Sequence, residues 1–337
     1  MNFSNLNILV TGADGFIGSH LTEKLVALGA NVKALAFYNA FNQVGWIDDM
    51  SHATKKNLEI LNGDIRDVEF INNCVKKIDI IFHLAALISI PYSYIATRSF
   101  IETNVIGTLN ILDAAKKSQC TKLIFTSTSE VYGTAKEIPI TETHILQAQS
   151  PYAASKISAD HLIESYVKSF KLPAVILRPF NTYGPRQSEK AVIPSIIRQA
   201  IDPKILSLKT GNIKTKRDFN FVSDTVMAFI MLAKADQNKI EFGNSYNSGS
   251  GVAVSISEVL NVIRDITNCK KKHEEESVRI RPENSEVELL LASAKKLNQL
   301  TNWSPKVSLN EGLKITIEWW QEKINSKSFL ASGDYKF

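Results

Sequence analysis

Tyr152 and Lys156 have the types and the spacing of a pair that could move a proton. Ser150 and Pro151, just before them, are typical of a helix N-cap and first turn, so side chains four residues apart should share one face of that helix. A tyrosine, whose ordinary pKa is about 10, can act as a base near neutral pH only if a neighbouring cation favours the phenolate. We therefore predict that Tyr152 is a base assisted by Lys156. The alternative is a solvent-facing helix with an incidental aromatic residue.

A second polar group, Thr128, Ser129 and Glu130, follows an apolar run at 123–125 that is typical of a buried strand. Polar side chains crowd the carboxyl end of this predicted strand, which suggests a site. The strand and the helix that starts near Ser150 are therefore the elements expected to position the chemistry.

Glycines 12, 15 and 18 lie where a predicted strand, 7–10, turns into a helix that ends near Gly29. Such glycines give a tight turn, close backbone approach and close helix packing, so that amides at the helix N-terminus can hold a pyrophosphate. The G-x-x-G-x-x-G spacing is a variant found in dinucleotide-binding folds. A glycine-rich turn without a ligand is the alternative.

Strands alternate with helical stretches through the first half of the chain. Besides 7–10, strands are expected at 32–37, 58–61, 78–84, 123–125 and 174–177. This rhythm predicts an α/β fold of the Rossmann type, a doubly wound parallel sheet with ligands at the carboxyl ends of its strands. Small residues after His83 leave room there for a cofactor, whereas His83 itself is expected to be a packed core histidine. Asn104 is expected to begin the helix that precedes strand 123–125.

Beyond Arg186 the alternation weakens, which indicates a smaller and less regular C-terminal part. We predict a dinucleotide-binding domain over 1–190, its sheet completed by later segments, a substrate-binding lobe over 191–324 and a tail over 325–337. Arg217, Arg279 and Arg281 fall in that lobe and could clamp a diphosphate, although a single arginine more often forms a surface ion pair. The mixed-charge run 270–276 is expected to be a solvated loop or helix end.

Composition narrows the possible functions. The net charge of +5 is spread along the chain without a basic stripe, which favours an anionic small molecule over nucleic acid. No apolar run approaches membrane-spanning length and the N-terminus lacks signal-peptide features, so no membrane association and a cytoplasmic location are expected. The three widely spaced cysteines, at 74, 120 and 269, predict neither a disulfide framework nor a metal site.

Taken in order, these residues resemble the extended short-chain dehydrogenase/reductase family, in its NAD-dependent epimerase/dehydratase branch. The matching motifs are T-G-x-x-G-x-x-G at 11–18, G-D-I-R-D at 63–67, H-L-A-A at 83–86, S-T-S-E-V-Y-G at 127–133, Y-x-x-x-K at 152–156 and R-P-F-N-T-Y-G-P-R at 178–186. The resemblance covers residues 5–322, with Lys216 where the family usually has threonine. Glu130 is similar to the nucleotide-sugar 4,6-dehydratases, and the whole chain most resembles the subgroup that acts on nucleotide-linked N-acetylglucosamine in legionaminic acid biosynthesis.

The resemblance implies a mechanism and a set of site residues. Tyr152, with Thr128, would oxidise carbon 4 of the sugar by passing hydride to NAD, and Glu130 would then remove the carbon 5 proton before water leaves carbon 6. Many such enzymes have aspartate where this chain has Ser129, so Glu130 would handle both protons. Implied cofactor-binding residues are Gly12, Gly15, Phe16, Ile17, Gly18, Asp64, Ile65, Leu84, Ala85, Ala86, Asn104, Tyr152 and Lys156. Implied substrate-binding residues are Asn181, Arg186, Arg217 and Arg281.

Several points stay open in the sequence. Ala36 stands where NAD-preferring Rossmann domains commonly have an acid, and no arginine replaces it, so NADP is not excluded. The resemblance favours GDP over UDP on the substrate, and it implies a homodimer through the helices after Asn104 and Ser150, with Ile111, Leu112, Ile157, Leu162 and Ile163 among their apolar residues.

Three other functions compete with the 4,6-dehydratase. Glu130 could be a structural carboxylate that pairs with an arginine. A nucleotide-sugar decarboxylase shares the S-T-S-E-V-Y-G motif and needs a cation such as Arg186 for its substrate's carboxylate, and a 4-epimerase is the other enzyme. A catalytically silent dinucleotide-binding module is disfavoured, because Tyr152 and Lys156 are both present.

Overall fold

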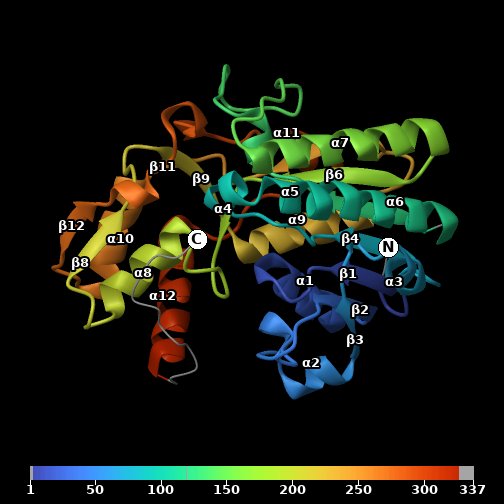
Figure 1. The fold of residues 1–337 in the computed structure, drawn as a ribbon, viewed down its shortest axis with the longest axis horizontal. Helices are drawn as coiled ribbons and strands as arrows, with labels where there is room; N and C mark the ends of the chain where they lie inside the picture. The colour runs from blue at the N-terminus through green and yellow to red at the C-terminus, as the bar shows by residue number, and fades with distance from the viewer. Residues whose placement is uncertain (1–2, 119, 326–337) are drawn as a thin grey trace.

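The computed structural model describes residues 3–118 and 120–325 (Figure 1). The predicted tail therefore lies outside the described residues, apart from Asn325, the last residue of a helix. No helix among the described residues is long and apolar enough to cross a membrane.

A parallel sheet forms the centre of the molecule. In the described part of the chain it has seven strands in the order β10-β6-β5-β4-β1-β2-β3, which is the doubly wound arrangement with a reversal between β1 and β4. The predicted Rossmann fold is thus confirmed. The strands are β1 (Asn7–Thr11), β2 (Asn31–Phe37), β3 (Leu58–Gly63), β4 (Ile80–His83), β5 (Lys122–Thr126), β6 (Ala174–Pro179) and β10 (Ser245–Ser248).

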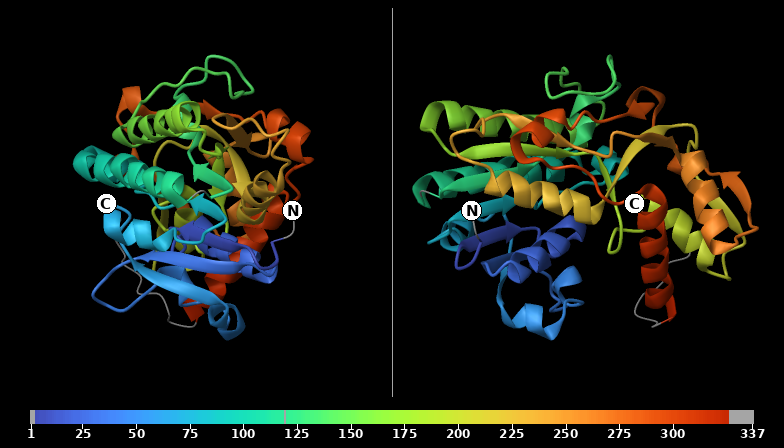
Figure 2. Two further views of the ribbon diagram at one scale, coloured as in Figure 1. Left: turned by 90° about the vertical axis from the view of Figure 1, so that its right-hand side faces the viewer. Right: turned by 180° about the vertical axis from the view of Figure 1, so that it is seen from behind.

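Helices cover both faces of this sheet because its strands are apolar on both sides (Figure 2). Ile8 and Val10 of β1 belong to the core on the face of α1 (Phe16–Ala27) and α9 (Val222–Lys234). Leu9, between them, belongs to the core on the opposite face, under α3 (Val68–Cys74), α6 (Gly107–Ser118) and α7 (Pro151–Phe170). Ser150 accepts a hydrogen bond from the Ala153 amide at 3.1 Å, and so forms the predicted cap of α7.

One long helical segment begins earlier than predicted. Asn104 does not start a helix: it lies in a π-helical stretch, Ile101–Ile106, that joins α5 (Thr97–Phe100) to α6. A short helix, α4 (Ile90–Ile95), precedes α5. The extra residue in a π turn changes which side chains face inward, and such turns are frequent at functional sites.

The remaining elements lie mostly to one side of the sheet, at the left in Figure 1. The helices are α8 (Val192–Ile201), α10 (Ile256–Thr267), α11 (Lys295–Thr301) and α12 (Leu309–Asn325), and the strands are β7 (Asn181–Tyr183), β8 (Ser207–Thr210), β9 (Lys216–Phe221), β11 (Ala253–Ser255), β12 (Lys272–Glu275) and β13 (Leu289–Leu290). β12 pairs in parallel with β8, so the expectation of a loop or helix end at 270–276 is wrong. Short elements elsewhere are α2 (His52–Lys56) and 3-10 turns at Gly45–Ile47, Ser129–Tyr132, Ser277–Arg279 and Glu283–Ser285.

Candidate active site

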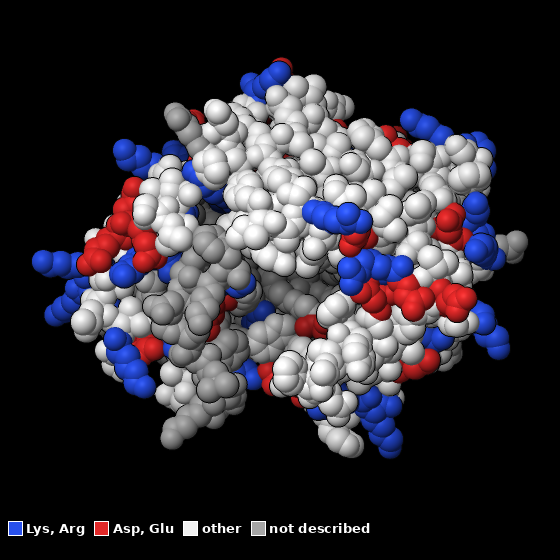
Figure 3. Space-filling model, in the orientation of Figure 1, with Lys and Arg blue, Asp and Glu red and all other residues white. Residues whose placement is uncertain are grey.

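A large cleft opens between the carboxyl ends of the sheet strands and the C-terminal elements. Its volume is about 2550 Å³, well above the roughly 300–1,000 Å³ of a pocket for one small ligand. The face in Figure 3 is hollowed at this place, with acidic and basic side chains visible in the hollow. The cleft therefore has room for two ligands side by side.

Tyr152 and Thr128 meet on the wall of the cleft. The Tyr152 side chain is 7% exposed and packs edge-on against Phe100, at 6.2 Å between ring centroids. Burial raises the pKa of the Tyr152 phenol, while a hydrogen bond with the Thr128 side chain works in the opposite direction. The negative charges of Glu130 and Asp160 add to the rise. In the chain by itself Tyr152 is therefore a phenol, and the predicted lowering of its pKa by Lys156 is not found.

Lys156 lies behind this wall rather than on it. Its side chain is buried, and its Nζ lies 4.2 Å from the centroid of the Phe125 ring. Burial lowers the pKa of Lys156 to about 8, although the negative charge of Asp160, one turn further along α7, favours the ammonium form. Lys156 therefore sits between an aromatic ring and a buried carboxylate, one layer beneath the cleft.

Glu130 stands next to this pair, in the short turn that follows β5. The turn is capped by Thr128, whose hydroxyl accepts a hydrogen bond from the Glu130 amide at 3.2 Å. The Glu130 side chain lines the cleft and forms an ion pair with Arg281, with 3.5 Å between Oε2 and Nη1. Glu130 thus faces the same space as Tyr152, and it also has the arginine partner that a purely structural carboxylate would have.

The predicted substrate-binding residues all line the cleft, but some of their side chains already have partners within the protein. Arg217 pairs with Glu286, with 3.3 Å between Nη2 and Oε1. Arg186 is held by Glu23 of α1 through two hydrogen bonds of 2.8 and 3.1 Å. The side-chain oxygen of Asn181 is buried and has no hydrogen-bond partner among the described residues, as expected of a group that meets a ligand.

The glycine-rich turn has a shape that only glycine allows. Gly12 has a φ of +69°, and a Cβ added there would lie 2.8 Å from the Ala85 amide nitrogen, while a Cβ on Gly18 would lie 2.0 Å from the Gly12 carbonyl oxygen. Close packing therefore explains these two glycines. At Gly15 the N-terminus of α1 has no side-chain cap among the described residues and faces the cleft, so its amides can receive an anion.

His83 holds the backbone beside that turn. The Thr11 hydroxyl accepts hydrogen bonds from the amides of Leu84 and Ala85, both at 3.1 Å, so its proton is free for Nδ1 of His83 at 2.7 Å. Nε2 of His83 lies 3.1 Å from the Thr108 hydroxyl, which itself donates to a carbonyl. This pattern assigns the neutral ring with hydrogen on Nε2, and the prediction of a packed core histidine is confirmed.

Asn104 is placed differently from its predicted role in cofactor binding. It is buried, and its amide group bonds both the N–H and the C=O of Leu87, at 2.8 and 2.9 Å, and the hydroxyl of Ser155 at 2.9 Å. It is not among the described residues that line the cleft. Asn104 therefore positions the segment after β4 against α7, at one remove from any ligand.

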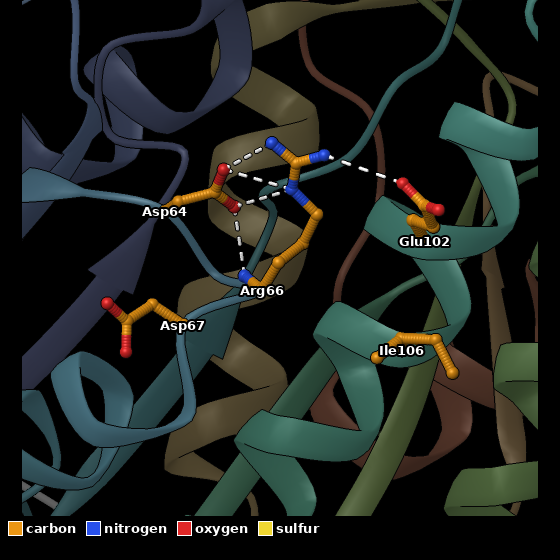
Figure 4. Close-up of a pocket in the computed structure, with 5 residues that line it drawn as sticks. All are labelled: Asp64, Arg66, Asp67, Glu102 and Ile106. Atoms are coloured by element: carbon orange, nitrogen blue, oxygen red, sulfur yellow. Dashed lines mark hydrogen bonds and ion pairs between the residues drawn. The ribbon is translucent and has the colours of Figure 1, made fainter.

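At the β3 end of the cleft, Asp64 and Arg66 form a tight pair. The Asp64 carboxylate accepts hydrogen bonds from the Arg66 guanidinium at 2.5 to 3.0 Å, and Glu102 lies 3.7 Å from the other side of that guanidinium (Figure 4). These bonds lower the pKa of Asp64 and raise that of Arg66. A shallow hollow of about 420 Å³ surrounds the pair.

Sequence reasoning missed several residues of the cleft wall. They include Trp46, the segment Ile88–Tyr92, and Arg198 and Gln199 of α8. None of them belongs to a motif with a mechanism, and only the fold brings them to the cleft. For Trp46 a weak signal existed, namely an aromatic residue in a polar, non-periodic stretch after the second strand.

The comparison with known families matches this geometry. Residues 9–316 fit the family model described as GDP-mannose 4,6 dehydratase. The chain belongs to the GDP-mannose 4,6-dehydratase family. The resemblance to the NAD-dependent epimerase/dehydratase branch of the short-chain dehydrogenases/reductases is thereby confirmed, and the chain is an enzyme of the nucleotide-sugar dehydratase and epimerase group.

Individual relatives of this dehydratase-family chain include both reaction types. It is 32% identical to dTDP-D-glucose 4,6-dehydratase from Homo sapiens over 332 residues, which cover 95% of this chain and 91% of the relative. Among solved structures it resembles UDP-glucose 4-epimerase from Thermotoga maritima with UDP-glucose, with a TM-score of 0.85, 28% identity and coverage of 95% and 100%. It also resembles UDP-glucuronic acid 4-epimerase from Bacillus cereus with UDP-glucuronic acid and NAD, with a TM-score of 0.84, 28% identity and coverage of 94% and 99%.

Proposed function

We propose that the protein is an NAD-dependent 4,6-dehydratase that converts nucleotide-linked N-acetylglucosamine, with GDP favoured over UDP, to the 4-keto-6-deoxy sugar. The observation that carries the dehydratase activity is Glu130, a carboxylate on the same cleft wall as Tyr152 and Thr128. Oxidation at carbon 4 needs only the tyrosine and threonine, whereas elimination of water needs a second base. Glu130 supplies that base. The hexosamine and a role in legionaminic acid biosynthesis rest on the sequence resemblance alone.

The glycine-rich turn fits NAD, because the uncapped amides at the start of α1 can receive its pyrophosphate. We propose that Leu84, Ala85, Ala86, Asp64 and Ile65 line the rest of its site, since all of them face the cleft. When bound, NAD takes hydride from carbon 4 and returns it to carbon 6. We assign residues 1–190 mainly to this cofactor and 191–324 to the nucleotide sugar.

The first proton belongs to Tyr152. Its hydroxyl oxygen, as phenolate, takes the proton of the sugar 4-hydroxyl while the Thr128 hydroxyl holds the same sugar oxygen. Burial opposes the phenolate in the chain alone, so ionisation requires a positive charge brought into the cleft. Lys156, under the wall, adds its own positive charge as long as it stays protonated, which its pKa of about 8 allows at neutral pH.

The second and third protons belong to Glu130. The 4-keto group acidifies the hydrogen on carbon 5, Glu130 removes that proton, and the same carboxyl passes it to the departing 6-hydroxyl, which leaves as water. When hydride returns to carbon 6, carbon 5 takes up one proton, which balances the proton that Tyr152 took from the 4-hydroxyl. Ser129 adjoins it but is too weak an acid for that step. Arg281 must yield its 3.5 Å contact with Glu130 as the substrate's diphosphate draws the arginine away.

One further activity has an observation in its favour. The structural likeness to UDP-glucose 4-epimerase and UDP-glucuronic acid 4-epimerase makes 4-epimerisation the second candidate. An epimerase returns the hydride to carbon 4 and has no use for a base at position 130. The decarboxylase is less favoured, because Arg186, the cation it needs, is already held by Glu23.

Product analysis tests the proposal. Purified protein is incubated separately with GDP- and UDP-linked N-acetylglucosamine and with dTDP-glucose, and the sugars are examined by mass spectrometry and NMR. We expect loss of one water, a 4-keto-6-deoxy sugar and no net consumption of added NAD. A 4-epimer with its 6-hydroxyl intact, or carbon dioxide from the matching uronic acid, would contradict the dehydratase activity. If only dTDP-glucose is converted, the proposed N-acetylglucosamine substrate is wrong but the dehydratase activity stands.

A further inference from the structure

The end of β2 lacks the acid that NAD-preferring Rossmann domains commonly place there. Ala36 occupies that position, and residues 37–46 contain neither an acid nor a cation. A carboxylate at this point normally accepts a hydrogen bond from the 2′-hydroxyl of the adenosine ribose and repels the 2′-phosphate of NADP. The strand itself therefore offers no means of telling the two cofactors apart.

A carboxylate reaches the same point from the glycine-rich turn. Asp14 lies between Gly12 and Gly15, and its Oδ2 accepts a hydrogen bond from the amide of Phe37, the last residue of β2, at 3.1 Å. Asp14 lines the cleft together with Leu35, Phe37 and Trp46. No cation pairs with it in the part of the chain that the structure describes, so its charge is available to a ligand.

Asp14 is also fixed in place from its other side. Its backbone carbonyl accepts a hydrogen bond from the Trp46 amide at 3.0 Å. Gly45 has a φ of +58°, and a Cβ there would lie only 2.5 Å from that carbonyl oxygen. The segment after β2 is therefore packed directly on Asp14, and the Asp14 carboxylate lies at the end of the strand.

Arg66, a cation that lines this end of the cleft, is not free to bind a phosphate. Arg66 is held between Asp64 and Glu102, as Figure 4 shows. The charges of Asp64 and Arg66 therefore largely cancel where they line the cleft, and Asp14 remains as a carboxylate without a cationic partner among the described residues. A 2′-phosphate, which adds about two negative charges, would meet repulsion here without a compensating partner.

We infer that Asp14, supplied by the glycine-rich turn in place of the missing β2 acid, selects NAD over NADP by accepting a hydrogen bond from the adenosine ribose. This inference rests on the proposed function only in assuming that a nicotinamide dinucleotide binds along the glycine-rich turn. It assigns the choice between NAD and NADP to position 14, which the G-x-x-G-x-x-G motif leaves variable.

Binding measurements without any sugar test the inference. Isothermal titration with NAD and with NADP gives both dissociation constants for the wild type, Asp14→Asn and a control, Glu69→Gln, which removes an exposed acid of α3. Asn keeps the acceptor for the Phe37 amide but loses the charge. We expect the wild type and the control to bind NAD at least about tenfold more tightly than NADP, and Asp14→Asn to shrink that preference by about tenfold, mainly through tighter NADP binding.

The outcomes separate this inference from the proposed function. An unchanged ratio of the two dissociation constants in a folded Asp14→Asn protein overturns the role of Asp14, even if the enzyme makes a 4-keto-6-deoxy sugar. Equal affinity of the wild type for NAD and NADP overturns it as well. If Asp14→Asn does not give the wild-type circular dichroism spectrum, Asp14→Ser, which also removes the charge, is measured against the same two criteria. A normal preference for NAD with no dehydratase product contradicts the proposed function alone.

Discussion

Tyr152 is surrounded by groups that oppose its ionisation. Burial and the charges of Glu130 and Asp160 raise its pKa, and only the Thr128 hydroxyl works the other way. In the mechanism we propose, Tyr152 therefore becomes a base only when a cation enters the cleft, and it stays protonated while the cleft is empty. Because the charge of Glu130 acts on Tyr152, the contributions of these two residues must be separated by experiment.

Tyr152→Phe and Glu130→Gln should fail at different stages. Tyr152→Phe removes the base for carbon 4, so neither reduced cofactor nor product should form. Glu130→Gln keeps the first hydride transfer but loses the carbon 5 base, so reduced cofactor should accumulate, absorbing near about 340 nm, while product formation slows by about 10²- to 10⁴-fold. Stopped-flow absorbance and product analysis measure the two stages.

Glu137→Gln is the matched control for that experiment, because Glu137 is an exposed acid in the same stretch of chain. It should behave as the wild type. If Glu130→Gln also turns over at the wild-type rate, Glu130 serves only to hold Arg281, and the main support for the dehydratase is lost.

Among the site residues, sequence reasoning succeeds where a motif is local and fails where a contact is distant. Tyr152 and Lys156 lie on one capped helix, as their spacing and the Ser150-Pro151 start predicted, although the predicted effect of Lys156 on the pKa of Tyr152 is not found. The pairing of Arg186 with Glu23 joins residues 163 positions apart, and no local pattern contains it. The pKa of Tyr152 was misjudged for the same reason, because burial depends on the packing of α4, α5 and α7 and not on the neighbouring lysine alone.

At the scale of elements, His83 joins β4 to β1 and to α6 through Thr11 and Thr108. Burial, together with the charge of Lys156, lowers the pKa of His83 to about 3. Between that value and the ordinary value of about 6.5, the unfolded chain binds a proton that the folded chain does not. The free energy of unfolding therefore falls as pH drops through this window, by about 2–3 kcal/mol at pH ~4.5 from this residue alone.

His83→Asn should remove that part of the pH dependence. Urea unfolding at neutral pH and at pH ~4.5 should show a loss of stability that is smaller by about 2–3 kcal/mol in the variant than in the wild type. His161→Asn, on the exposed side of α7, should leave the wild-type difference intact. An equal loss in His83→Asn and the wild type would show that His83 is not the proton acceptor.

Gly18→Ala should separate α1 from the turn that precedes it. The added Cβ would lie 2.0 Å from the Gly12 carbonyl oxygen, so the helix start must move away. We expect a loss of about 1–3 kcal/mol in stability and at least about tenfold weaker NAD binding, measured by urea unfolding and titration. Lys24→Ala, on the exposed side of the same helix, is the control, and equal NAD affinity in both variants would contradict the role of the turn.

Strands and helices with at least one buried face were predictable from their apolar residues, whereas the exposed strand β12 was not. The strands of the central sheet carry continuous apolar runs because helices cover both faces. β12, in contrast, is the charged run Lys-His-Glu-Glu, and three of these four residues are exposed. Its pairing with β8 depends on backbone hydrogen bonds that leave no hydrophobic pattern. The early start of the helical segment at α5 was missed because the π turn breaks the 3.6-residue repeat.

At the scale of the whole molecule, we predict a homodimer through the outer side of α5, α6 and α7. Ile111, Leu112 and Ile163, which the sequence offered for this contact, are fully buried in the chain's own core and cannot take part. Apolar residues that remain exposed around α4, α5 and the π turn include Ile95, Ile101 and Ile106.

Light scattering at micromolar concentration should give twice the mass of the chain, and the double substitution Ile101→Glu with Ile106→Glu should give the mass of one chain. Leu206→Glu, at an exposed apolar residue outside these helices, should leave the dimer intact. A wild-type mass equal to one chain would refute the prediction.

The strand β10 has a consequence for how the protein is made. It is the edge strand beside β6, yet it follows strands β8 and β9 in the chain. Helix α9, which covers the sheet, lies between β9 and β10 in the sequence. During synthesis the first six strands therefore leave the ribosome before α9, which covers the sheet, and before β10, which adds the last strand to it. The nascent Rossmann half therefore has β6 as its edge strand, and lacks its last strand, until about residue 248 has emerged, and an unpaired edge of this kind is a site where nascent chains can associate wrongly.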